Sequence, residues 1–209
     1  QKNWKIQQAD NKVVDDLAVS LGVSTSIAQL LVLRGITTFD QAKQFFRPDF
    51  SQMHNPLLMK GMQNAVDRLQ QAISNKEKIL IYGDYDVDGT TSVAMMYAFL
   101  QELNPNITYY IPCRYKEGYG ISLEGIDYAA ENHFTLIIAL DCGIRAVDQI
   151  EYAHKKGIDF IICDHHNPDS EIPNAIAVLN PKQEDCNYPF KELSGCGVGF
   201  KFIQAFSEQ

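Results

Sequence analysis

The sequence predicts a doubly wound α/β domain with a mostly parallel sheet, preceded by an N-terminal helical cap. Five short apolar runs without polar alternation lie between residues 78 and 179, as expected for strands buried on both faces. Stretches with helical spacing separate most of these runs, which implies right-handed crossovers between parallel strands. Three of the runs are followed directly by acidic or imidazole side chains, at the sheet edge where such folds bind ligands.

The helical cap and its connector are assigned to residues 1–59. Helices are expected in the segments "NKVVDDLAVSLGV", "STSIAQLLVLRG" and "TTFDQAKQFFRP", which combine helical spacing with capping residues, glycine or proline at their ends. The segment "PDFSQMHNP" is expected to connect the cap to the next domain. Trp4 is expected to pack within the cap.

The α/β domain is assigned to residues 60–209 and is expected to begin with an amphipathic helix at 60–75. The later elements follow from the apolar runs and the helical stretches between them. Strands are expected at 78–83, 107–112, 135–140, 159–163 and 175–179, with helices at 90–103, 122–132 and 145–156.

Composition limits the class of protein. No apolar run is long enough to cross a bilayer, and the N-terminus lacks a signal pattern. The five cysteines form no CxxC pair, which favours reduced thiols and a cytoplasmic location. The net charge of −8 argues against a nucleic-acid ligand unless bound metal neutralises part of the acid.

The chemistry is expected where the strands end. Two carboxylates about 4 Å apart repel by roughly 4 kcal/mol at an effective dielectric near 20, against a total stability of about 5–15 kcal/mol. Several aspartates gathered at one edge of the sheet therefore need bound cations, or some of them must be protonated. Carboxylates with imidazole and no thiolate favour Mn²⁺, then Mg²⁺, over Zn²⁺. The residues concerned are Asp84, Asp86 and Asp88 after the first strand, Asp141 after the third, and Asp164, His165 and His166 after the fourth.

Three of these motifs admit more than one interpretation. "DYDVDG" matches the first half of a calcium-binding EF-hand loop, but the twelfth position is Met95 instead of glutamate, and a strand precedes it. In "CRYKEGYGIS", Arg114 is a candidate phosphate contact and Tyr119 a candidate base-stacking residue; a glycine turn with exposed charges is the alternative. In "SGCGVGFKF", the backbone around Gly197 is a candidate anion contact, with helix packing as the alternative.

The motifs "GDYDVDGTTS", "LDCG", "DHH" and "GCGVGFKF", in this order, resemble the DHH phosphoesterase superfamily. The helical segments before the first strand and "RYKEGYGIS" are most similar to the RecJ-type single-strand DNA exonucleases. This resemblance implies two Mn²⁺ or Mg²⁺ ions and hydrolysis of single-stranded DNA from the 5′ end, releasing mononucleotides in repair and recombination. It implies single-stranded DNA, a helicase or a single-strand-binding protein as partners, and no membrane.

The resemblance also implies a role for each site residue. The catalytic pair would be His166, meeting a metal or the scissile phosphate, and Asp164, orienting a histidine. Arg114 would contact the nucleic-acid backbone. The metal ligands would be Asp86, Asp88, Asp141 as the bridge and His165, with Asp84 as a further ligand or in contact with one.

Two departures from the family pattern bear on this assignment. Tyr82 stands where many superfamily members have a histidine ligand, so one metal site is expected to depend on Asp84 instead. A further aspartate and two further domains are expected downstream, so the chain resembles an N-terminal fragment with weak or no activity of its own. The alternatives are a phosphoesterase of small nucleotides, such as oligoribonucleotides or cyclic dinucleotides, and a non-catalytic scaffold that holds DNA or replication proteins.

Overall fold

The computed structural model describes residue 3 and residues 5–209, so Trp4 lies outside the described residues. The chain divides into two compact units, Gln1–Met53 and His54–Gln209. Among the described residues, no single helix is long and apolar enough to cross a bilayer; the bent pair formed by the first two helices meets that test only jointly.

The first unit is the expected set of three short helices, α1 (Asn11–Leu21), α2 (Thr25–Val32) and α3 (Phe39–Phe46). Each begins at a side-chain cap, and Thr38 forms a complete capping box with Gln41 at the start of α3. Apolar side chains of α1 and α2 form a small core of their own.

The connector residues from position 54 onward belong to the second unit. After the turn η1 (Phe50–Gln52), the short helix η2 (Pro56–Leu58) packs against the last helix of the chain. Pro56 and Met59 are buried there. The units therefore separate at residues 53 and 54, whereas the sequence pattern placed the boundary at residues 59 and 60.

The second unit is a five-stranded parallel sheet with the order β2-β1-β3-β4-β5. The three central strands are apolar along almost their whole length and almost completely buried, which explains the absence of alternation in their sequences. The strands are β1 (Ile79–Gly83), β2 (Ile107–Tyr110), β3 (Leu136–Leu140), β4 (Asp159–Cys163) and β5 (Ala177–Leu179).

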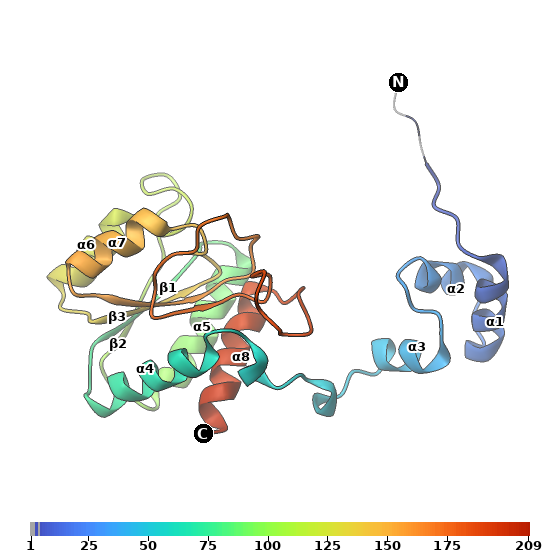
Figure 1. Ribbon diagram of the computed structural model, residues 1–209, viewed down its shortest axis with the longest axis horizontal. Coiled ribbons are helices and arrows are strands. Elements are labelled where there is room, and N and C mark those ends of the chain that lie inside the picture. The colour runs from blue at the N-terminus through green and yellow to red at the C-terminus, as the bar shows by residue number, and fades with distance from the viewer. Residues whose placement is uncertain (1–2, 4) are drawn as a thin grey trace. The chain divides into compact units, whose positions relative to one another are not determined.

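Helices cover both faces of the sheet, as Figure 1 shows. On one face, α4, α5 and α8 enclose the larger apolar core, which includes Met96 and Phe202. On the other face, α6 and α7 enclose a second core that includes Phe160. The helices are α4 (Met62–Ser74), α5 (Val87–Gln101), α6 (Leu123–Glu131), α7 (Val147–Lys155) and α8 (Gly195–Ser207).

The doubly wound class is confirmed, and one helix begins earlier than expected. Helix α5 begins at Val87, three residues before the expected start, because the Asp86 side chain caps it by accepting from the Gly89 amide. No helix links β4 to β5, although both strands are parallel. The irregular segment 164–176 makes that connection, and the Asp164 amide donates to the Leu179 carbonyl.

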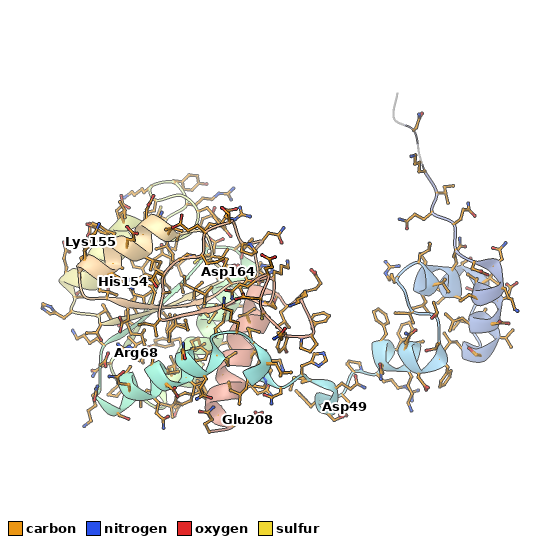
Figure 2. All side chains as sticks on the ribbon, viewed as in Figure 1. Asp49, Arg68, His154, Lys155, Asp164 and Glu208 are labelled. Atoms are coloured by element: carbon orange, nitrogen blue, oxygen red, sulfur yellow. The ribbon has the colours of Figure 1, made fainter. Side chains whose placement is uncertain are left out.

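At the amino ends of the strands, acidic side chains are neutralised by the protein itself. Figure 2 labels Arg68, which lies on α4. The Arg68 guanidinium lies 2.7 Å from a carboxylate oxygen of Glu77 and 2.7 Å from one of Asp159. The Thr135 hydroxyl donates to Glu77 as well. These contacts, with burial opposing them, hold the pKa of Glu77 below its ordinary value.

Candidate metal centre

The strand order reverses direction between β1 and β3, and two of the predicted acidic residues follow these strands. Gly83 is paired with Leu140, so the next residues, Asp84 and Asp141, leave the sheet side by side. Such a reversal leaves a crevice at the carboxyl ends of the strands, because the connections on either side depart to opposite faces. Both carboxylates are nearly inaccessible, with exposed fractions of 1% and 2%.

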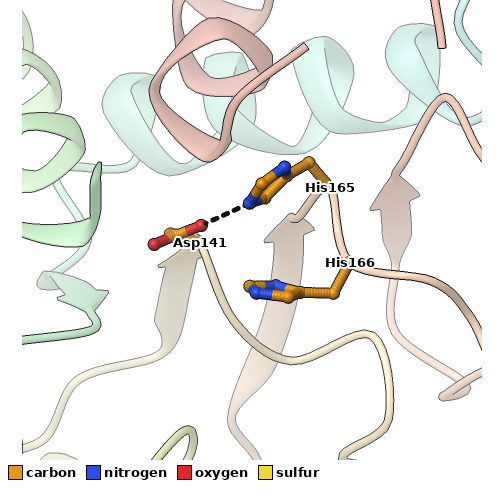
Figure 3. Close-up of side chains that lie close together, drawn as sticks. All are labelled: Asp141, His165 and His166. Atoms are coloured by element: carbon orange, nitrogen blue, oxygen red, sulfur yellow. Dashed lines mark ion pairs between the residues drawn. The ribbon is translucent and has the colours of Figure 1, made fainter. Parts of the chain in front are cut away.

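The end of β4 adds the two histidines to the same edge. Asp141 donates its amide to the Cys163 carbonyl, which sets the residues after β4 beside it. Figure 3 shows the Nε2 atom of His165 pointing at Asp141 Oδ1, at 3.2 Å. The approach does not meet hydrogen-bond geometry. Adjacent donors of an octahedral ion with bonds of about 2.1 Å stand about 3 Å apart, so this spacing suits two ligands of one ion.

Asp141 joins two groups of side chains whose donor atoms lie within 4.8 Å of one another. One group is all carboxylate and contains Asp84 and Asp86; the other contains His165 and His166. A shared carboxylate between two such groups is the arrangement expected for two ions bridged by one ligand. Asp86 is exposed, whereas the other two carboxylates are buried.

Asp84 and Asp141 have buried oxygens without a hydrogen bond in the part of the chain that the structure describes, although His165 Nε2 approaches one of them. Both carboxylate oxygens of Asp84 and the Oδ1 atom of Asp141 accept no hydrogen bond. A buried ionised carboxylate without a partner is strongly unfavourable, so these atoms fit a bound cation. Asp141 also adopts a left-handed backbone conformation, with φ of 61°, which costs of order 1 kcal/mol in a non-glycine residue.

Electrostatics lead to the same conclusion. Burial, with the nearby charges of Asp88 and Asp86, raises the pKa of Asp141 to about 7. Burial is also the main cause of the raised pKa of Asp84. A divalent ion would favour the ionised form of both groups and remove this unfavourable term.

Asp164, in contrast, is fully satisfied. Its Oδ1 accepts from the backbone amides of His165 and His166 and lies 2.7 Å from His166 Nδ1, while Oδ2 accepts from the Ile144 amide. Burial opposes its ionisation, but these hydrogen bonds outweigh burial and keep its pKa below the ordinary value. The same contact raises the pKa of His166 and fixes its ring.

Asp88 is placed differently from its two neighbours in the motif. It lies in the first turn of α5, and its two oxygens accept hydrogen bonds from backbone amides at the start of α8. Its Oδ2 is 3.7 Å from His165 Nε2, so it borders the centre without joining either ligand group.

Two of the three predicted nucleic-acid contacts, Arg114 and Tyr119, lie on either side of Tyr85, whereas Gly197 is engaged elsewhere. Arg114 stacks on Tyr85, 5.4 Å from the ring centroid, and Tyr85 packs edge-on against Tyr119. The Tyr119 hydroxyl is 3.1 Å from His166 Nε2, which places this residue at the centre. The Gly197 amide donates instead to Ser194 Oγ, the cap of α8.

Sequence reasoning missed two features of this edge, and a third agrees with the expectation that Tyr82 is a poor ligand. Tyr85, inside the acidic motif, supports Arg114; an aromatic residue between aspartates was the available signal. A cavity of about 240 Å³ lies beside His166, with Arg145 and Gln149 in its wall. Tyr82 points away from the centre, because its hydroxyl donates to the Gly120 carbonyl and accepts from the Ser122 amide.

Comparison with known proteins identifies the family. The model of the DHH family, N-terminal domain, matches residues 78–209. The single-stranded-DNA-specific exonuclease RecJ of Bacillus subtilis (strain 168) is 46% identical over 97% of this chain, and the protein of the same name from Escherichia coli (strain K12) is 38% identical over 70%. This chain spans only 26% of the length of each relative.

Solved structures show the same fold. A crystal structure of exonuclease RecJ bound to manganese superposes with a TM-score of 0.65 over 72% of this chain and 38% of that chain, at 31% identity. RecJ in complex with Mn²⁺ from Thermus thermophilus superposes with a TM-score of 0.72 over 94% of this chain and 27% of that chain, at 25% identity. The chain therefore belongs to the DHH family.

Proposed function

We propose that this chain is the metal-binding part of a single-stranded-DNA exonuclease that uses Mn²⁺ or Mg²⁺ and acts from the 5′ end, releasing mononucleotides. The observation that carries the proposal is the buried, unpartnered acid of Asp84 and Asp141 beside two histidines. Relatives named as single-stranded-DNA-specific exonucleases support the substrate. A cytoplasmic location, a role in repair and recombination, and work with a helicase or single-strand-binding protein are part of the same proposal.

The residues of this chain suit two bound ions. Asp84, Asp86 and Asp141 would hold one, and Asp141 with His165 would hold the other, with Asp88 at its border. Bound there, the ions would lower the pKa of a water and stabilise charge on a phosphoryl oxygen.

Two contacts of His166 orient its ring toward the position where a phosphate would bind. Asp164 holds the Nδ1 side of His166, so Nε2 faces the open edge, where it meets the Tyr119 hydroxyl. A phosphate placed at this edge would compete with Tyr119 for His166 Nε2. The exposed Arg114 on Tyr85 would then contact a neighbouring phosphate of the strand.

One observation favours a second candidate, a phosphoesterase of small nucleotides. The cavity of about 240 Å³ beside His166 is bounded by Tyr119 and Arg145, and a small concave site of this kind suits a short substrate as well as the end of a strand. A non-catalytic scaffold is disfavoured, because nothing in a scaffold requires unpartnered buried carboxylates.

The test is a hydrolysis assay on the full-length protein with Mn²⁺, comparing 5′-phosphorylated single strands, duplexes and dinucleotides. We expect single strands to be degraded to mononucleotides, and Asp86→Ala or His165→Ala to abolish the reaction while the circular dichroism spectrum is unchanged. Asp67→Ala, an exposed carboxylate on α4 away from the centre, is the matched control. Full activity in either site variant would refute the assignment, and exclusive cleavage of dinucleotides would select the second candidate.

A further inference from the structure

The first turn of α8 forms part of the wall of the metal centre. The Gly195 amide donates to Asp88 Oδ2 at 2.7 Å, and the Cys196 amide donates to Asp88 Oδ1 at 2.8 Å. These amides belong to the four at a helix start that have no partner within the helix, and they carry the positive end of the helix dipole. These two hydrogen bonds join the starts of α5 and α8. The bonded residues lie 107 and 108 positions apart in the sequence.

The same turn also touches the shared carboxylate. A Cβ atom added to Gly195 would lie 2.3 Å from Asp141 Oδ1, 2.6 Å from its Cβ and 2.7 Å from its Cγ. These separations are too short for a carbon atom and an atom to which it is not bonded. Asp141 cannot retreat easily, because it is buried at the end of β3 and its amide is bonded to Cys163. Position 195 therefore excludes every side chain while Asp141 keeps its place.

The other two glycines of "GCGVG" lack this constraint. A Cβ at Gly197 would come within 3.3 Å of the Leu193 Cδ2 atom, and one at Gly199 within 3.2 Å of the Leu140 Cδ2 atom. Both neighbours are ends of flexible side chains, which can move by a few tenths of an ångström. The three glycines of one motif therefore serve different purposes, and only Gly195 adjoins the ligands.

We propose that Gly195 is a positioning residue of the metal centre, acting on two carboxylates at once. Its missing side chain lets the α8 terminus approach Asp141, and its amide, with that of Cys196, fixes the Asp88 carboxylate beside His165. Each Asp88 oxygen accepts one amide there and keeps a second lone pair for an ion. The inference rests on the proposed function, since it assigns Gly195 to the same ions.

The test is the affinity of the full-length protein for Mn²⁺, measured by isothermal titration calorimetry on metal-stripped samples. We expect Gly195→Ala to weaken binding by about 10–100-fold, the range found when residues that orient metal ligands are changed. Gly197→Ala and Gly199→Ala are the matched controls, and both are expected to bind within about threefold of wild type. Alanine is otherwise favoured over glycine in a helix, so a loss confined to position 195 cannot come from helix propensity.

A second pair of variants covers the case in which Gly195→Ala does not fold. Cys196→Pro keeps glycine at position 195 but puts the proline Cδ where the Cys196 amide hydrogen was, so it removes one donor to Asp88 and displaces the Asp88 carboxylate; proline is tolerated in the first turn of a helix. We expect it to weaken Mn²⁺ binding, whereas Cys196→Ala should not. Ser194→Ala removes the cap of α8 and should lower the unfolding temperature with unchanged affinity, as a purely structural role would.

The outcomes separate this inference from the proposed function. Wild-type protein that binds no Mn²⁺ would overturn both. Wild-type protein that binds Mn²⁺, with Gly195→Ala and Cys196→Pro binding equally well, would overturn the positioning role and leave the metal centre standing. Equal losses in all three glycine variants would also overturn it, because the effect would then belong to the helix as a whole.

Discussion

Acidic side chains gather at both ends of the sheet, but a basic side chain of the protein neutralises them only at the amino ends of the strands. At the amino ends of the strands, Glu77 and Asp159 share the Arg68 guanidinium. At the carboxyl ends, Asp84 and Asp141 are more deeply buried, and the oxygens named above accept nothing from the described residues. The first cluster carries its own cation, and the second fits a cation supplied from outside.

The difference shows that acidic residues alone do not mark a metal centre. Both clusters sit at strand ends, and both are partly buried. What separates them is whether a fixed positive group already satisfies the carboxylates. An imidazole beside buried carboxylates that no guanidinium neutralises, as at His165, favours a metal site over an ion pair.

The largest expected effect comes from removing the shared carboxylate. Asp141→Ala should lower Mn²⁺ affinity and strand hydrolysis by about 100-fold or more, because both ligand groups lose a member. Asp159→Ala, its counterpart at the amino edge, should leave affinity unchanged. Calorimetry and a gel assay of the full-length proteins measure both, and equal losses in the two variants would remove the distinction between the edges.

The amino edge should respond in stability instead. Arg68→Met leaves two carboxylates without their cation and should lower the free energy of unfolding by about 2–4 kcal/mol, with Mn²⁺ affinity unchanged. Urea denaturation measures the loss. Lys60→Met breaks an exposed pair with Asp185 and should cost less than about 1 kcal/mol. A loss at Arg68 no larger than at Lys60 would contradict the role given to this network.

The two edges should also have opposite pH dependence in metal-free protein. The raised pKa of Asp141 means that the folded state binds a proton more tightly than the unfolded state, so stability should rise as pH falls from about 7 toward 4. The full effect is on the order of 2–4 kcal/mol. Glu77 has a lowered pKa, so the stability it contributes is present above its unfolded value and is lost as pH falls through its folded value.

Denaturation curves across pH 3–8 test this contrast. Asp141→Asn should reduce the rise between about pH 7 and 4, leaving the contribution of Asp84, whose pKa is also raised, and Glu77→Gln should reduce the loss at lower pH. Saturating Mn²⁺ should reverse the first trend, because protonation of the ligands then competes with the metal. A wild-type curve that is flat between pH 4 and 7 without metal would count against an ionised, uncompensated Asp141.

The smallest effect among the site variants is expected at Tyr82. Tyr82→Phe removes the bonds to Gly120 and Ser122 and should cost about 1–2 kcal/mol of stability, with Mn²⁺ affinity unchanged. Thermal unfolding and calorimetry measure the two quantities. A fall in Mn²⁺ affinity would instead make Tyr82 a ligand, as its place in the motif allowed.

Local sequence patterns predicted the sheet and its acidic edge. Parallel strands buried on both faces appear in the sequence as unbroken apolar runs. The residues that follow such strands lie at one edge of the sheet, and Asp84, Asp141 and His165 are found there. The capping role of Asp86 was equally local, three residues from the Gly89 amide, but the apolar spacing alone placed the helix start three residues too late.

Long-range packing set the rest of the site. Which glycine of "GCGVG" meets the centre depends on the rotation of α8 against α5 and β3, and sequence spacing does not contain that rotation. The same packing gives Asp88 its amide partners, and the stacking of Arg114 on Tyr85 depends on the path of the loop after β2. The segment between β4 and β5 has no hydrophobic periodicity that would predict a helix or a strand. Only the strand pairing in the structure shows that it connects two parallel neighbours.

The most direct measurement is the anomalous diffraction of crystals of this chain grown with Mn²⁺. We predict a manganese peak within about 2.0–2.4 Å of an Asp141 carboxylate oxygen, with Asp84 or His165 among its other ligands. Crystals at millimolar Mn²⁺ with no anomalous peak at this edge, and with the Asp84 and Asp141 oxygens hydrogen-bonded to the protein itself, would contradict the account.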